Sequence, residues 1–311
     1  MTNRPPFKEV RHTFCAIRDP RSSIRNPPPP FCSRPRDRPH FLPTGRSQPS
    51  RVPRLHGMER ASKNVELDGV KSGLWSGKDD VKFRTIDPSD GKINKASLYK
   101  LMISGVTPRP VGFISSISSE GQTNLAPFSY FNIACHDPPM LMVSINHPEP
   151  DKPKHTCDFI LQTKNFTTNI ISEPFVDAAN YTSIDAPKGV SEWALSGLTP
   201  KKSDTIDAPR VGESGFSMEC ELEHHYPIHN DNKDRTSTII IGRIKRFHVR
   251  DDLIDDSLLV DTERLLPVSR LGGITYGRTR EVYETPRPVW EKEKERDEVK
   301  KILGSDGKAK V

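Results

Sequence analysis

A series of short β-branched and apolar runs between residues 111 and 249 restricts the fold of this chain more than any other feature. Such runs, bounded by Pro, Gly, Asn and Asp, are typical of β-strands. Only two segments between them have the apolar spacing of a helix. Strands with so few intervening helices favour an antiparallel β-barrel over alternating βαβ units. We expect strands over 111–118, 131–135, 140–146, 166–171, 216–224 and 238–249, and helices over 156–164 and 173–181.

Other segments flank or interrupt these runs. Apolar spacing over 96–104 predicts a short helix, and residues 81–94 are polar with strand-like fragments. Residues 182–215 are rich in Gly, Pro, Ser and Asp, which predicts a long irregular excursion, and such excursions in compact domains are usually functional. The charged run 290–304 predicts a helix that faces solvent.

The first 57 residues differ sharply from the rest. They hold 12 of the 29 prolines and 12 basic residues against three acidic ones, while the remaining residues hold 35 basic and 38 acidic ones. A segment so rich in Arg and Pro has too little apolar area to offset the entropy of folding. We therefore expect a disordered extension, with translation from Met58 as one possibility. Two alternatives are a mitochondrial leader, which these prolines would disrupt, and an arm for anionic polymers, which lacks aromatic residues for stacking.

Hydropathy and cysteine content indicate the compartment. No run approaches the ~20 apolar residues of a membrane span, and the N-terminus lacks the apolar core of a secretory signal. We expect a soluble cytoplasmic protein, with a mitochondrial one as the alternative. The five cysteines are odd in number and form no CxxC pair, which predicts reduced thiols instead of a disulfide framework or a structural zinc site.

Two motifs in the first half of the strand series carry candidate binding residues. Residues 107–110 (TPRP) place Arg109 on a stiff backbone, where a guanidinium can hold a phosphate through two hydrogen bonds; the alternative is an exposed surface arginine. Residues 124–132 (NLAPFSYFN) place Ser129 and Asn132 among aromatic side chains. That mixture suits a planar heteroaromatic ligand, although the aromatic residues can equally be plain core.

Two further motifs are weaker when taken singly. Lys154 and Thr156 stand just before a predicted helix, whose free backbone amides favour an anion. Residues 270–276 (RLGGITY) have paired glycines that allow close backbone approach, and Tyr276 can stack on a ring or hydrogen-bond to it. The alternative for this motif is a tight turn.

Several other chemistries are not supported. His224 and His225 are adjacent, so in a strand they point to opposite faces and cannot both bind one ion without distortion. We therefore predict no metal site, although His229 and two glutamates lie nearby. The sequence contains no GxSxG, HExxH, P-loop or GxGxxG motif, which removes the common hydrolase, metalloprotease, nucleotide-hydrolase and Rossmann interpretations.

Taken in order, the motifs resemble the flavin reductase-like family, the FMN-binding split β-barrel proteins that include flavoredoxins and the reductase partners of two-component monooxygenases. The resemblance spans residues 96–290. It predicts a mainly β fold, an antiparallel split β-barrel with short helices, between a lead-in at 58–95 and a charged tail at 291–311. It rests on TPRPVGFISSIS (107–118), NLAPFSYFN (124–132), DPPMLMVSI (137–145), KHT (154–156), SGLTP (196–200), APRVGES (208–214) and RLGGITY (270–276).

The resemblance implies a homodimer that binds FMN noncovalently along the dimer interface. The implied contacts to its phosphate, ribityl chain and ring edge are Arg109, Ser129, Asn132, Lys154 and Thr156, with Tyr276 near the ring or the partner subunit. The chain departs from the family at His155, where an acid commonly stands, and this weakens the inference of phosphate contacts there.

The implied activity is that of an FMN-dependent flavin reductase with NADH or NADPH as donor. Because the flavin itself accepts the hydride, no general base is needed and no catalytic side chain is assigned. One alternative is an FMN-binding electron carrier without nicotinamide turnover. Another is a protein that binds anionic polymers through residues 1–57, and we expect neither nucleic-acid nor membrane partners for the folded domain.

Overall fold

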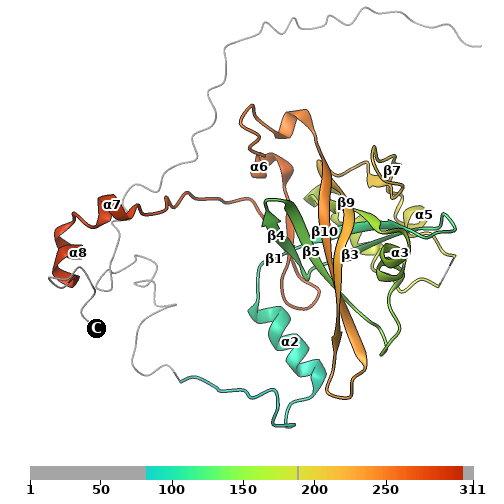
Figure 1. Ribbon diagram of the computed structural model, residues 1–311, viewed down its shortest axis with the longest axis horizontal. Helices are drawn as coiled ribbons and strands as arrows, with labels where there is room; N and C mark the ends of the chain where they lie inside the picture. Colours follow the sequence, from blue (N-terminus) through green and yellow to red (C-terminus); the bar gives the residue numbers. More distant parts are fainter. Residues whose placement is uncertain (1–81, 188, 304–311) are drawn as a thin grey trace, which may run out of the picture. The chain divides into compact units, whose positions relative to one another are not determined.

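The computed structural model describes residues 82–187 and 189–303 (Figure 1). The predicted disorder of residues 1–57 and most of the predicted lead-in at 58–95 lie outside these ranges. Residues 82–94 contain no strand, so the strand-like fragments expected there do not form one. In the described part of the chain, no helix is both long and apolar enough to cross a membrane.

An antiparallel sheet forms the body of the molecule (Figure 1). Its seven strands pair in the order β3-β2-β6-β9-β10-β5-β4. The long hairpin β9–β10 supplies its two longest strands. The sheet consists of β2 (Gly112–Ile117), β3 (Thr123–Phe128), β4 (Phe131–His136), β5 (Pro139–Asn146), β6 (Asn165–Ile170), β9 (Phe216–His229) and β10 (Arg235–Val249).

Two small sheets and several short helices complete the fold. The sheets are β1 (Arg109–Pro110) with β11 (Val268–Arg270) and β12 (Tyr276–Arg278), and β7 (Pro200–Lys201) with β8 (Arg210–Val211). The α-helices are α2 (Lys95–Gly105), α3 (His155–Thr163), α4 (Val176–Tyr181), α5 (Glu192–Ser196), α6 (Thr262–Leu265), α7 (Trp290–Glu293) and α8 (Asp297–Ile302). Two 3₁₀ turns are η1 (Glu173–Phe175) and η2 (Asp251–Leu253).

The sheet curls because its two edge strands are consecutive in the chain. Only Ser129 and Tyr130 separate β3 from β4, so the two edges must approach each other. At this seam the ring of Phe131 packs on Gly112, where an added Cβ would lie 2.7 Å from a ring carbon. A side chain at position 112 on β2 would therefore displace the ring of Phe131 from this seam.

Two apolar clusters stabilise the fold. The first fills the barrel with buried side chains from α3 and from most strands of the large sheet, including Ile114, Val143, Ile160 and Ile240. The second lies under α4 and α5 and contains Phe113, Leu125, Trp193 and Val211. Strand β2 contributes to both clusters, which explains why all but one of its residues are buried.

The described cysteines are free thiols, as the sequence predicts for these three residues. Cys157 on α3 and Cys220 on β9 are fully buried, and burial raises the pKa of each thiol. Cys135 on β4 is half-buried, and its sulfur lies 3.2 Å from the carbonyl of Asp137.

The predicted mainly β, antiparallel fold with short helices is confirmed, and its differences from the structure are local. The segment expected as one helix over 173–181 begins with the 3₁₀ turn η1, which contains Pro174. The run 290–304 is broken into α7 and α8. The excursion 182–215 is less irregular than expected, because it contains α5, β7 and β8.

Candidate functional site

A cleft of about 520 Å³ lies between β3, the N-terminus of α3, and the segment that connects α4 to α5. Its walls include Asn124 and residues 126–128 of β3, residues 152–156, residues 182–187, and Glu192. Clefts of this size are typical of small-molecule and cofactor sites. The structure therefore brings together parts of two predicted motifs, NLAPFSYFN and KHT, with the first part of the excursion.

The N-terminus of α3 gives this cleft a positive end. Lys154 is the N-cap residue, but its side chain makes no capping hydrogen bond, and it is exposed with no ion pair among the described residues. The first amides of a helix have no intrahelical acceptor, so those of His155, Thr156 and Cys157, which donate to no other described residue, are free to bind an anion. Two sources of positive potential thus meet at one wall.

A buried hydrogen bond fixes this helix end to the sheet. The Nδ2 atom of Asn124 donates to Oγ1 of Thr156 over 2.7 Å, and both side chains are buried. Thr156 keeps its own hydroxyl proton as a donor. Strand β3 therefore sets the position of the threonine at the start of α3, and two residues 32 positions apart in the sequence act as one unit.

Arg109 lies outside this cleft, and its guanidinium is already hydrogen-bonded within the protein. Its side chain is buried, and its Nη1 donates to the carbonyls of Ile103 and Val106 over 2.5 and 2.6 Å. Its Nη2 donates to the carbonyl of Leu271 over 3.0 Å, and its Nε makes a long, 3.4 Å bond to Oγ of Ser129. The guanidinium thus ties the end of α2 and the β11–β12 loop to the seam, and it does not line the cleft.

The other predicted site residues also lie outside the cleft walls. Ser129 is half-buried at the seam beside Arg109, and Asn132 is exposed on β4, where its Oδ1 accepts from the amide of Ile133. Tyr276 on β12 donates its hydroxyl to Asn180 over 3.1 Å, and the guanidinium of Arg270 lies 4.5 Å from its ring centroid. Of the six predicted residues, the structure brings only Lys154 and Thr156 into one cleft.

Sequence reasoning missed Glu192, which is the first residue of α5 and lies in the cleft wall. The side chain is buried, and its Oε2 has no hydrogen-bond partner in the described structure. Burial raises the pKa of this carboxyl, whereas the amides of Glu192 and Leu125 and the nearby His155 lower it. The only sequence signal that could have indicated the position of Glu192 is Ser191, a typical N-cap residue whose side chain caps α5.

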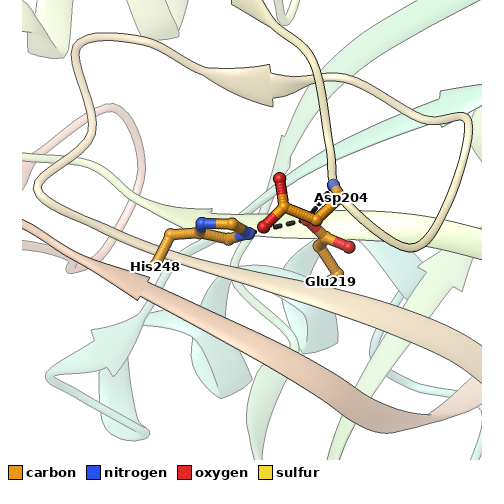
Figure 2. Close-up of side chains that lie close together, drawn as sticks. All are labelled: Asp204, Glu219 and His248. Atoms are coloured by element: carbon orange, nitrogen blue, oxygen red, sulfur yellow. Dashed lines mark hydrogen bonds and ion pairs between the residues drawn. The ribbon is translucent and has the colours of Figure 1, made fainter.

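Sequence reasoning also missed a second buried glutamate, Glu219, whose carboxylate is fully hydrogen-bonded (Figure 2). Glu219 on β9 accepts hydrogen bonds from the amides of Asp204 and Thr205, from the hydroxyl of Thr205, and from Nε2 of His248. Burial raises the pKa of Glu219, but these hydrogen bonds together lower it to about 2. The carboxylate of Glu219 therefore holds the 203–205 loop against the β9–β10 hairpin.

Figure 2 also draws the donor set that most resembles a metal site. One atom each from Asp204, Glu219 and His248 lie within 4.8 Å of one another. Arg246 pairs with Asp204, and the oxygens of Glu219 are already shared among four donors. An ion would have to displace these bonds, so the hydrogen-bonded arrangement accounts for the cluster. His224 and His225, weighed in the sequence, are both exposed on β9.

The family model for the flavin reductase like domain matches residues 104–269. The chain belongs to the flavin reductase-like family. This membership supports flavin-related oxidoreduction, and the predicted family and split-barrel fold are confirmed. An uncharacterized protein of Aquifex aeolicus is 37% identical over 180 residues, which cover 58% of this chain and 89% of that protein.

Two solved structures extend the comparison. Nitrilotriacetate monooxygenase component B from Bacillus cereus is 34% identical, with a TM-score of 0.63, and the match covers 66% of this chain and all of that one. A protein of Shewanella frigidimarina, described as a flavin reductase with a split barrel domain, is 22% identical. Its TM-score is 0.59 over 67% of this chain and 100% of that one, which supports the fold.

Proposed function

We propose that this chain is an FMN-dependent flavin reductase that takes electrons from NADH or NADPH. The observation that carries the proposal is the meeting of β3 and the N-terminus of α3 in one cleft, with Lys154 at its edge and without an ion pair to any described residue. An unpaired cation beside free helix amides suits a phosphate, and the apolar side chains of residues 126–128 suit part of a flavin. Family membership supports the flavin, and the anion-binding end favours its phosphorylated form.

In this proposal Lys154, Thr156 and the first amides of α3 hold the phosphate. Asn124 keeps the hydroxyl of Thr156 in place through their buried hydrogen bond. When bound, the flavin supplies the hydride chemistry, and the protein orients it and tunes it through hydrogen bonds and charge. The residues of the cleft therefore bind the flavin, orient it and exclude water from it, and no general base is required.

Ser129 and Asn132 remain proposed contacts for the ring edge or ribityl chain, because Ser129 directly follows β3, which lines the cleft, and Asn132 lies at the start of β4, the next strand. Arg109 takes a different role from the one that the sequence suggests. Its guanidinium donates to three carbonyls and to Ser129, so we propose that it positions Ser129 and the seam and does not bind phosphate. A role for Tyr276 near the ring or the partner subunit stays a prediction.

We also propose that the protein is a homodimer. Helix α2 has eleven residues and buries only Ile103, while Tyr99, Leu101 and Met102 on the same helix are each about half exposed. Ile133 on the edge strand β4 is 75% exposed. Apolar side chains exposed on an edge strand and a helix support burial against a second copy.

The test uses the purified full chain. It should take up FMN, absorb in the visible range, and lose that absorbance when NADH or NADPH is added without oxygen. Reduction by dithionite but by neither nucleotide would replace the reductase with an electron carrier. A protein that takes up no flavin at any concentration would overturn the proposal.

A further inference from the structure

The chain that runs from β12 to the start of α7 forms an exposed arm, residues 281–290. Residues 281–289 lie in neither a helix nor a strand, and every residue of the arm is exposed. Tyr283 is 71% exposed and Trp290 is 56% exposed, and Val282 and Val289 are exposed beside them. A single exposed apolar side chain is ordinary, but four within ten residues indicate a surface that binds a partner.

The base of the arm is fixed to the barrel. Arg278 on β12 and Arg280 both pair with Glu173, over 2.6 and 2.7 Å. Further along the arm, Pro286 and Pro288 restrict the backbone and oppose its folding as a helix. The arm therefore leaves the barrel from a defined point, and its ten residues can reach up to about 35 Å.

Helix α2 presents a second surface that lacks a cover. It buries only Ile103 of its eleven residues, although helices in proteins depend mainly on packing for their stability. Lys95, Tyr99 and Met102 follow the i, i+4, i+7 spacing of one helix face, and all three are exposed. Lys95 has no ion pair among the described residues. This face therefore combines a cation with two apolar side chains.

The arm and this face of α2 are complementary in charge and polarity. On the arm, Glu281 and Glu284 flank Val282 and Tyr283, and neither glutamate has an ion pair among the described residues. An apolar pair between two acids thus matches a face with a cation and two apolar side chains. Eleven helical residues span about 16 Å, so the arm is long enough to lie along the whole helix. Both surfaces are exposed in the same chain, so an arm does not cover its own α2.

We propose that the arm of each copy packs against α2 of a second copy, so that two arms are exchanged in a homodimer. A contact between two different surfaces of one chain, made twice about a two-fold axis, covers both surfaces on both copies. The inference rests on the proposed homodimer and deepens it, because it names the segments that hold the two copies together.

The experiment measures the dissociation constant of the dimer by sedimentation equilibrium of the full chain at low salt, where exposed charges act most strongly. Lys95→Glu places an acid against the acidic arm, and Glu281→Lys/Glu284→Lys places a basic arm against Lys95. Each variant alone should raise the dissociation constant by about tenfold, because like charges then meet at both contacts. An equal mixture of the two variants should return to within about threefold of wild type, because each arm then meets a helix of opposite charge.

The mixture distinguishes exchange from other arrangements. An arm that folds onto its own α2 gains nothing from mixing, and a variant that fails to fold does not recover. Tyr283→Ala tests the apolar part of the contact and should also weaken the dimer by about tenfold. Leu259→Ala is the matched control, because that leucine is 69% exposed and belongs to neither surface. It should leave the dissociation constant unchanged.

Two results would overturn the inference and leave the proposed flavin reductase intact. One is a dimer that the charge variants and Tyr283→Ala do not weaken, and the other is a pair of weakened variants that do not recover when mixed. A wild-type chain that stays monomeric would overturn the proposed homodimer and this inference together. Uptake of FMN by the same samples tests the proposed reductase separately.

Discussion

Glu192 and Glu219 are both buried glutamates, and their surroundings are opposite. Glu219 accepts four hydrogen bonds, which hold its pKa at about 2, while Glu192 keeps an oxygen without a partner and burial raises its pKa. The protein has satisfied the first charge with its own groups, so that residue is structural. One oxygen of Glu192, in the wall of the cleft, has no such partner among the described residues.

The same contrast separates the two cations that the sequence suggests for one phosphate. Arg109 is buried and spends its donors on three carbonyls and Ser129, whereas Lys154 is exposed with no ion pair among the described residues. If satisfied groups build the fold and unsatisfied groups bind, substitutions should separate into losses of stability and losses of affinity.

Arg109→Ala should have the largest effect. It leaves the carbonyls of Ile103, Val106 and Leu271 without their donor and opens a cavity, so we expect a loss of about 3–4 kcal/mol in the free energy of unfolding. Urea denaturation measures it, with the exposed Lys100→Ala as a control that should change by less than about 0.5 kcal/mol. A stable Arg109→Ala protein with weakened FMN binding would instead support a contact between Arg109 and the phosphate.

Glu219 should dominate the acid sensitivity of the fold. Its pKa is about 2 when folded against an ordinary value of 4.5, so its contribution is complete above pH 4.5 and is lost as the pH falls toward 2. The difference amounts to about 3 kcal/mol. Unfolding measured across this range should therefore give a shallower pH dependence for Glu219→Gln than for wild type.

The control for this experiment lies on the same strand. Glu221 on β9 is exposed and pairs with Lys245 over 3.2 Å, a surface contact that contributes little. Glu221→Gln should therefore keep the wild-type pH dependence. Equal slopes for wild type and Glu219→Gln would show that the hydrogen bonds to Glu219 do not control acid stability.

Lys154→Ala should change affinity and leave stability alone. Loss of one charge-assisted hydrogen bond should raise the Kd for FMN by about tenfold to a hundredfold, through ~1.5–3 kcal/mol, with little change for riboflavin. Lys152→Ala is the matched control, because that lysine lines the same cleft but is paired with Glu149. Similar losses for FMN and riboflavin in Lys154→Ala would argue against a phosphate contact.

Tyr276→Phe should have the smallest effect. It removes one exposed hydrogen bond to Asn180, so we expect less than about 1 kcal/mol in stability and an unchanged Kd for FMN. Titration with FMN decides the point. A tenfold loss of affinity would instead support the family-based expectation that Tyr276 lies near the ring.

The sequence predicts the strands and helices whose pattern is local. Helices α2 and α3 and most strands of the large sheet follow from apolar spacing that the chain carries in each segment. Strand β3 was not predicted, because Leu125–Phe128 is continuously apolar with Pro127 inside it, and only its pairing with β2 makes it a strand. The pairing partners of a segment lie elsewhere in the chain, so the local pattern of a segment cannot predict a strand that depends on its pairing.

The same limit explains the site. The motifs around Asn124 and Thr156 were recognised singly and through the family, but their hydrogen bond depends on how β3 meets α3. Arg109 is satisfied partly by Leu271, 162 residues away, so nothing near it in the chain distinguishes it from a free surface arginine. Burial of Glu192 and Glu219 is likewise a property of the assembled fold, since isolated acidic residues in a sequence usually indicate surface.

The position of Cys157 has a consequence for chemical durability. The thiol follows Thr156 directly on α3, yet it is fully buried and its pKa is raised, so it stays protonated at neutral pH. Oxidation of cysteine proceeds through the exposed thiolate. A thiol kept in this state beside the proposed flavin site should resist peroxide and leave the start of α3 intact. Cys220, fully buried on β9 of the large sheet, shares that protection.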